Sequence, residues 1–318
     1  MGINMKFEFR EIVGLSNMDC FIKSWECAFS RKMDHKIYDW MFHERNHVFI
    51  ASHEDSVIAG YCLLEIEAVI GGVLTAGLLC NNVFVNGFRY SKNGVFTKLT
   101  EFALDSLSEQ FSFGLGFPND KSVRSHLRAG WEIPFSLDFI EYRLDNLDYT
   151  DACLKVTTLP VCNMTLGQIA DSFENLNNLN YSFFLGKSFN FLHWRFVSNP
   201  RYEYFFTSIQ VGKSASSFII SKYFPDLNKV HIVDFCILCK KDIPLLINGM
   251  SHYYRSLGCE FNVIDLWSSD LDALSFFEYG FKSVGRSQPV IFKFLTDCSP
   301  MVDYSSFPHL VLSDNDVY

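Results

Sequence analysis

A glycine-containing segment between two apolar stretches carries the clearest chemical pattern in the chain. It spans residues 82–99 and reads NVFVNGFRYSKNGVFTKL. Gly94 precedes apolar residues at the three- and four-residue spacing of an amphipathic helix, so the segment leads into a helix N-terminus. Exposed backbone N–H groups and the positive end of the helix dipole meet there, and glycine allows close approach of a ligand. The pattern suits a phosphate or pyrophosphate, although an ordinary strand-to-helix connection has the same pattern.

A second set of residues follows the apolar run FSFGLGF at 111–117, with Asn119, Ser122 and His126 at three- and four-residue spacing and then Gly130 and Trp131. Together with the first segment, this set resembles the GNAT superfamily of N-acetyltransferases, in which a strand, a pyrophosphate loop and a helix precede a second strand and an Asn-containing motif. The resemblance covers residues 6–145 well and residues 160–295 as a degenerate copy. The matching residues of the second motif are Asn119, Ser122, His126, Gly130 and Trp131.

The pyrophosphate loop departs from the family pattern at two positions. Ser91 stands where Gln or Arg is usual, and Phe96 stands where a small residue is usual. The resemblance nevertheless implies that acetyl-CoA lies across splayed strands of the first domain, with its pyrophosphate on backbone amides. The residues implied in cofactor binding are Phe84, Val85, Arg89, Lys92, Asn93, Gly94, Val95, Phe96, Asn119 and Ser122.

Acetyl transfer to an amine needs a neutral amine, a polarised thioester carbonyl and a proton for the departing thiolate. His126 holds the position at which the family usually carries a tyrosine that serves the thiolate, and imidazole can donate a proton near neutral pH. A histidine that only packs on its helix is the competing interpretation. The base is then a water or a carboxylate from elsewhere in the chain. Glu65 and Glu67 are expected to line the acceptor side, and Asp314 and Asp316 in the C-terminal segment are the other source, although chain ends are often frayed.

An internal repeat organises the elements that position these residues. IYDWMFHERN at 37–46 is echoed by FLHWRFVSNP at 191–200, and SHLRAGWEI at 125–133 is echoed by SFFEYGFKS at 275–283. Both matches have a spacing of roughly 150 residues, which indicates duplicated domains. The order of apolar strand and helix patterns agrees between the halves. We therefore predict an α/β (α+β) fold of two GNAT-like domains, each a mixed sheet flanked by helices.

The predicted domains are residues 1–150, which bind acetyl-CoA, residues 151–297, a degenerate copy, and residues 298–318, an acidic tail. Each half is expected to close its own sheet, with strands at 139–144 and 290–295. The second half runs through CKKDIPLL into its helix without a glycine, so one cofactor is expected per chain.

Composition restricts the function classes. The hydrophobic share of 48% and charged share of 20% are those of a globular protein, and no apolar run reaches the ~18 residues of a membrane span. The net charge of −9 argues against a nucleic-acid partner. The ten scattered cysteines predict reduced thiols and a cytoplasmic location. Cys236 and Cys239 form a single CxxC, so no metal site is expected.

These features favour an acetyl-CoA-dependent N-acetyltransferase acting on a small-molecule primary amine, for which an amino sugar of surface-polysaccharide synthesis is one acceptor class. Two alternatives stay open. The first is an aminoacyl-tRNA-dependent peptide transferase, although Gly94 and the negative net charge both argue against it. The second is a non-catalytic GNAT-fold binding or regulatory module, which Ser91 and His126 favour.

Overall fold

The structure is a computed structural model that describes residues 6–14, 18–42, 45–144, 156–211, 214–296 and 308–315. These residues form two compact units. Unit 1 comprises the described residues of 1–68, 74–135 and 289–301, and unit 2 those of 69–73, 136–288 and 302–318.

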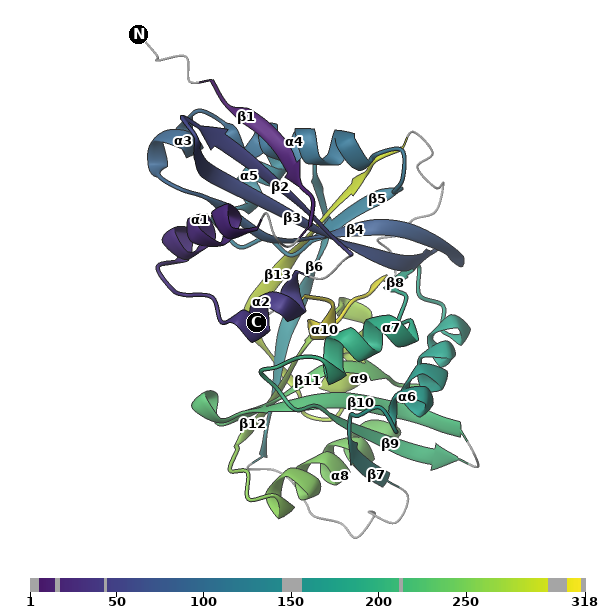
Figure 1. Cartoon of the computed structure of the whole chain (residues 1–318). Coiled ribbons are helices and arrows are strands. Elements are labelled where there is room, and N and C mark those ends of the chain that lie inside the picture. The colour runs from purple at the N-terminus through teal and green to yellow at the C-terminus, as the bar shows by residue number, and fades with distance from the viewer. Residues whose placement is uncertain are drawn as a thin grey trace. The chain divides into compact units, whose positions relative to one another are not determined.

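Unit 1 contains a mixed sheet with helices on both faces (Figure 1). Its elements are β1 (Glu8–Ile12), α1 (Asp19–Phe29), α2 (His35–Met41), β2 (Asn46–His53), β3 (Ser56–Ile70), β4 (Val73–Val85), α3 (Phe88–Lys92), α4 (Val95–Leu107), β5 (Phe113–Gly116), α5 (Val123–Arg128), and parts of β6 (Glu132–Arg143) and β13 (Lys282–Phe294). The strand order is β1-β2-β3-β4-β5-β13, with β4 and β5 parallel.

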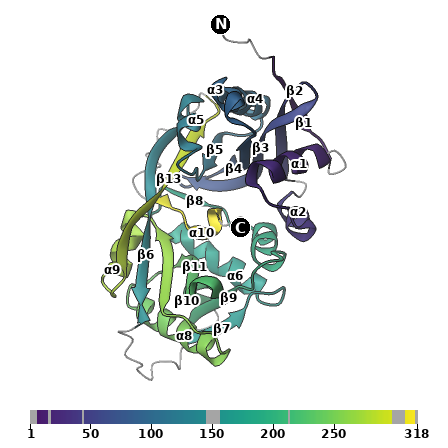
Figure 2. The same ribbon diagram turned by 90° about the vertical axis from the view of Figure 1, so that its left-hand side faces the viewer.

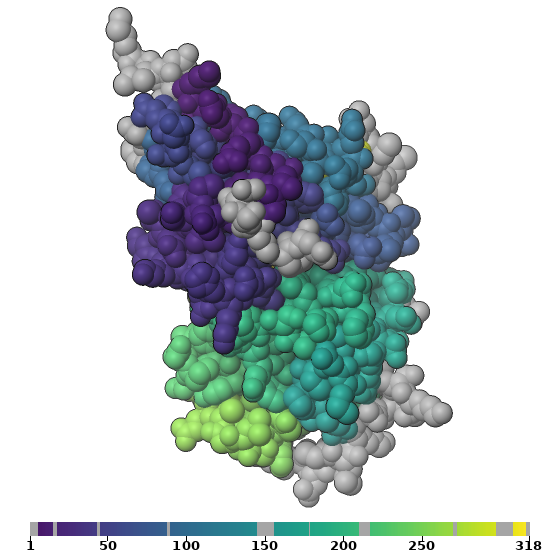
Figure 3. Space-filling view, viewed as in Figure 1, coloured from purple at the N-terminus to yellow at the C-terminus, as the bar shows by residue number. Residues whose placement is uncertain are grey.

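The alternation of side chains along β4 places different helices on its two faces. Val83 and Val85 pack into the apolar cluster that contains Leu99 of α4. Phe84 points the other way, and its ring centroid lies 5.2 Å from that of Phe21 in α1. The α1 and α2 segment, purple in Figure 3, forms part of the surface of this unit.

Unit 2 also has a mixed sheet between helices. Its elements are the remaining parts of β6 and β13, β7 (Val156–Pro160), α6 (Leu166–Phe173), η4 (Glu174–Asn178), β8 (Phe183–Leu185), α7 (Phe189–Leu192), η5 (His193–Val197), β9 (Phe205–Val211), β10 (Ser214–Phe224), η6 (Pro225–Leu227), β11 (Lys229–Cys236), α8 (Asp242–Ser256), β12 (Val263–Ser268), α9 (Asp270–Phe277), β14 (Pro308–His309) and α10 (Leu312–Asn315). The strand order is β7-β9-β10-β11-β12-β6, and β14 pairs with β8.

The two sheets have the same topology. Each begins with antiparallel strands, continues through one parallel pair, and ends with an antiparallel strand. The parallel pair is β4 and β5 in unit 1 and β11 and β12 in unit 2. The predicted repeat and the predicted mixed α/β architecture of two similar domains are therefore confirmed.

The last strand of each sheet comes from the other half of the sequence. Residues 291–294 of β13 pair with β5 in unit 1, and residues 138–143 of β6 pair with β12 in unit 2. The expectation that each half closes its own sheet is therefore wrong, because an apolar alternation identifies a strand but not its partner. Side-chain packing supports this strand exchange in unit 1, because Phe292 of β13 stacks on Phe113 of β5 with ring centroids 5.2 Å apart. The predicted assignment of acetyl-CoA binding to residues 1–150, of a degenerate copy to residues 151–297 and of an acidic tail to residues 298–318 stays a prediction.

Within the described ranges, no helix is long and apolar enough to cross a membrane. The same residues contain no group of three or more His, Cys, Asp or Glu side chains that could hold a metal ion.

Candidate functional site

The parallel strands of unit 1 stop pairing part of the way along β4. The last pair joins Cys80 to Gly116, where β5 ends, whereas β4 continues to Val85. Asn82 is buried and has a φ of 47°, in the left-handed region that non-glycine residues seldom adopt. Such a residue inside a strand turns the backbone locally, as β-bulges do beside active sites. The backbone of residues 83–85 thus lies beyond the β4–β5 ladder.

The segment between β4 and α4 is more ordered than the sequence suggested. The short helix α3 occupies its middle, and the amides of Asn93 and Gly94 donate to the carbonyl oxygens of Tyr90 and Ser91 at 3.1 and 3.2 Å. Gly87 and Gly94 flank this helix with φ values of 84° and 71°. The amide groups of Asn93 and Gly94 are therefore engaged within the turn.

The amides that remain for a ligand belong to the first turn of α4. This helix is 13 residues long, and the backbone N–H groups of Val95, Phe96 and Thr97 have no hydrogen-bond partner among the described residues. A Cβ atom placed on Gly94 would meet nothing within 4 Å, so the space beside this glycine is open. Figure 2 shows α3, α4 and α5 close to one another in unit 1. The geometry offers an anion three backbone donors and the positive end of a helix dipole.

The side chains predicted to bind the cofactor have varied surroundings. Phe84, Val95 and Phe96 are buried in the core of unit 1, so only their backbone could face a ligand. Lys92 and Asn93 are exposed, Val85 is half-buried, and the side chain of Arg89 lies outside the described residues. Cofactor binding by these residues stays a prediction.

Asn119 and Ser122 form the turn that begins α5. The Asn119 Oδ1 atom accepts hydrogen bonds from the backbone N–H groups of Lys121 and Ser122 at 3.0 and 3.1 Å. The Ser122 hydroxyl donates to the Asn119 carbonyl oxygen at 3.2 Å. Asn119 therefore stabilises the start of this helix, which is a common role of Asn at that position.

His126 lies inside the core, with 1% of its surface exposed. Its Nδ1 atom is 3.0 Å from the Ser122 carbonyl oxygen, which can only accept, so Nδ1 carries the proton. Nε2 is then an acceptor, and the Cys80 thiol, 3.5 Å away, is its donor. The rings of Phe96 and Trp131 pack edge-on against the imidazole at 4.9 and 5.6 Å.

Burial lowers the pKa of His126 to about 4, because the uncharged ring is favoured in this apolar environment. At neutral pH the ring is therefore neutral, and its single proton is held by the Ser122 carbonyl oxygen. The role of His126 as general acid stays a prediction, and these contacts favour a structural role. Helical spacing indicated the position of His126 on α5 but not how deeply that face is covered.

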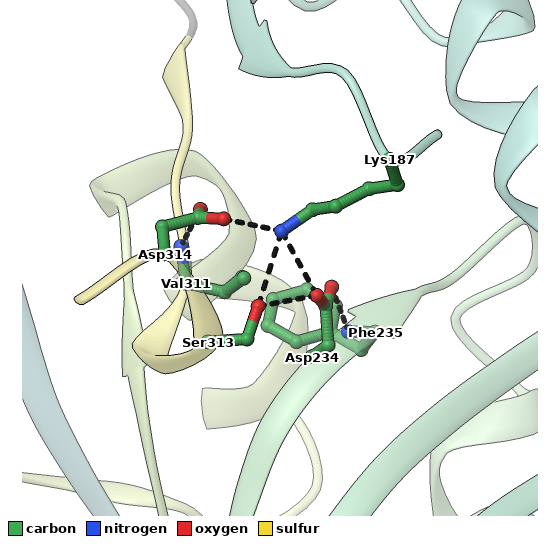
Figure 4. Close-up of polar contacts among 6 residues, drawn as sticks. All are labelled: Lys187, Asp234, Phe235, Val311, Ser313 and Asp314. Carbon is green, nitrogen blue, oxygen red and sulfur yellow. Dashed lines mark hydrogen bonds and ion pairs between the residues drawn. The ribbon is translucent and has the colours of Figure 1, made fainter. Parts of the chain in front are cut away.

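Asp314 belongs to a buried ionic cluster in unit 2 (Figure 4). Lys187 Nζ lies 3.0 Å from Asp234 Oδ2 and also pairs with Asp314 Oδ1. Asp314 Oδ2 accepts from the Val311 amide at 2.9 Å. Burial raises the pKa of Asp314, although the Lys187 ammonium group opposes this rise. The carboxylate is thus committed to holding α10 in place, and the frayed-end interpretation does not apply to residues 308–315.

The other carboxylates considered for the base are Asp316, Glu65 and Glu67. Asp316 lies outside the described residues. Glu65 and Glu67 lie within β3, and Glu65 Oε1 is 3.1 Å from Nε2 of His47, whose Nδ1 contacts Glu11. Sequence reasoning missed Asn82 as a backbone feature of the site, since an Asn in an apolar strand signals a left-handed backbone only weakly.

No family model and no curated protein matches the sequence. Solved structures do match. A GCN5-related N-acetyltransferase from Anabaena variabilis is 16% identical, with 92% of this chain and 74% of that chain covered and a TM-score of 0.72. Eis1 from Mycobacterium abscessus is 10% identical, with coverage of 91% and 74% and a TM-score of 0.63.

A tandem GNAT protein from the clavulanic acid biosynthesis pathway is 8% identical to this chain. The match covers 92% of this chain and 99% of that protein, with a TM-score of 0.57. At these identities the likeness establishes the fold. The chain has a tandem GNAT fold, which confirms the resemblance seen in its motifs.

Proposed function

We propose that this protein is an acetyl-CoA-dependent N-acetyltransferase whose acceptor is a small-molecule primary amine. The observation that carries the proposal is the first turn of α4, where three unpartnered amides follow Gly94 and open space lies beside that glycine. These donors suit the pyrophosphate of acetyl-CoA. The backbone of β4 beyond Cys80, which has left its ladder with β5, suits the extended pantetheine arm.

When bound, acetyl-CoA supplies a thioester, and the acceptor nitrogen forms a bond to the acetyl carbon as the carbon–sulfur bond breaks. The nitrogen loses a proton and the thiolate sulfur takes one up. Backbone N–H groups of residues 83–85, which follow Asn82 with its left-handed backbone, are the donors that we assign to the carbonyl oxygen. With His126 neutral and buried, we assign the thiolate's proton to water.

A second candidate function is a non-catalytic acetyl-CoA-binding module. The burial of His126 favours this alternative, because the residue at the family's acid position is engaged at both ring nitrogens. Such a module would bind acetyl-CoA without cleaving it.

Thiol release separates the two candidates. The full chain is incubated with acetyl-CoA and, in turn, an amino sugar, a polyamine and an aminoglycoside, and free coenzyme A and the acetylated product are measured. Amine-dependent release with a matching product mass supports the transferase. Saturable acetyl-CoA binding without release across all three amine classes supports the module and contradicts the transferase.

A further inference from the structure

Unit 2 contains a cavity of its own where its parallel strands part. The described pairing of β11 with β12 ends at His231 and Asp265, although the strands continue to Cys236 and Ser268. A cavity of about 520 Å³ lies near the end of β11, with apolar walls from Phe235, Ile237, Leu238 and Phe276. By the shared strand order, β11 and β12 correspond to β4 and β5 of unit 1.

The connection beside this cavity lacks the glycine turn that precedes α4 in unit 1. Among the described residues of the connection from β11 to α8, there is no glycine and no positive φ. Asp242 opens α8 with a carboxylate, which accepts a hydrogen bond from Ser217 at 2.6 Å. A negative charge at the helix N-terminus disfavours a phosphate there.

The cavity wall presents one carboxylate, that of Asp272. Its Oδ1 atom accepts a hydrogen bond from the Tyr181 hydroxyl at 2.8 Å, and its Oδ2 atom accepts from His309 Nδ1 at 2.8 Å and Ser269 at 3.2 Å. Lys240, which also lines the cavity, pairs instead with Glu278 at 2.8 Å. The one cation in contact with Asp272 among the described residues is therefore His309 when it is protonated.

Burial opposes the protonation of His309, and nearby carboxylates favour it. The ring is 1% exposed, and its Nε2 atom has no hydrogen-bond partner among the described residues. An imidazolium would therefore leave a buried N–H donor unpaired. Burial disfavours the charge, but the carboxylates of Asp272, Asp234 and Asp314 outweigh it and raise the pKa of His309. Lys187 holds the last two of these carboxylates, so Asp272 is the group whose charge His309 balances.

We propose that this cavity binds a primary amine with an aromatic or alkyl body, with its ammonium group on the Asp272 carboxylate. The body lies against the apolar wall, and the ammonium replaces the positive charge of His309 in balancing the carboxylate. The ring loses its unpaired Nε2 proton and keeps its Nδ1–H bond to Asp272. Binding therefore releases a proton from His309. This site adds a second ligand to the proposed function and does not depend on acetyl-CoA.

The test uses 4-fluorophenethylamine as the probe and fluorine NMR of the full chain without acetyl-CoA. We expect saturable binding that tightens as the pH rises from about 6 to about 8, and that weakens about tenfold or more in Asp272→Asn. Asp226→Asn, an exposed change of the same kind in unit 2, should leave the affinity unchanged. Ser275→Trp keeps the carboxylate but fills the cavity, and it should abolish binding even if Asp272→Asn folds poorly.

The neutral alcohol 4-fluorophenylethanol is the ligand control. Equal affinity for the alcohol and the amine, or equal affinity of the parent and a folded Asp272→Asn variant for the amine, would overturn the proposal. Acetyl-CoA binding is measured separately on the same variants. If acetyl-CoA does not bind in unit 1, that titration shows it, and the measured affinity for the amine is unaffected.

Discussion

Replacing His126 with Gln should remove a specific part of the protein's sensitivity to acid. The folded state holds His126 neutral, with a pKa of about 4 against an ordinary value of 6.5. Between these values the unfolded chain binds the proton more readily, so stability falls as the pH falls. At 1.36 kcal/mol per pKa unit, the loss from this one group is about 2 kcal/mol at about pH 5.

The assay is urea unfolding, followed by tryptophan fluorescence, at about pH 7.5 and about pH 5. The parent should lose about 2 kcal/mol more than His126→Gln on acidification. His35→Gln, the same substitution at an exposed position of α2, should follow the parent. If the parent and His126→Gln lose the same free energy, the ring is not buried and neutral, and its role as general acid regains support.

Two further substitutions test the packing of the units. Lys187→Met should lower the free energy of unfolding by about 3–5 kcal/mol, because it leaves two buried carboxylates without their ion-pair partner. The control Lys240→Met breaks an exposed ion pair and should lower it by about 1 kcal/mol or less. Equal losses in urea unfolding would contradict the buried cluster. Phe292→Ala should cost about 3–5 kcal/mol and reduce amide exchange protection of β5 in unit 1. The control Phe29→Ala, at an exposed position of α1 in the same unit, should leave β5 protected. Unchanged protection of β5 would refute the strand exchange.

The sequence was sufficient to predict the repeat and the order of strands and helices. Paired motifs such as those around Trp40 and Trp194 are local, and each half repeats the same periodicities. Strand partners were not predictable in the same way. Residues 290–295 have the apolar character of a closing strand in either unit, and their pairing with β5 depends on contacts distant in sequence, such as that of Phe292 with Phe113.

The candidate site was predictable where backbone chemistry defines it. Gly94 marked the start of α4, and its positive φ agrees with the choice of glycine there. Side-chain roles were harder to predict, because they depend on burial. His126 and Asp314 have the residue types of an acid and a base, yet one lies in an apolar core and the other pairs with Lys187. The sequence around His126 and Asp314 indicates neither that the first is buried nor that the second pairs with Lys187.

The most direct test of the acetyl-CoA site is calorimetric titration of acetyl-CoA into the parent, Gly94→Val and Gly258→Val. Gly258 is the matched control, since it also has a positive φ, of 78°, and open space around its Cβ position. We predict saturation near one equivalent for the parent and Gly258→Val, and no binding for Gly94→Val. Binding of acetyl-CoA to Gly94→Val as tight as to the parent would contradict the site at the start of α4.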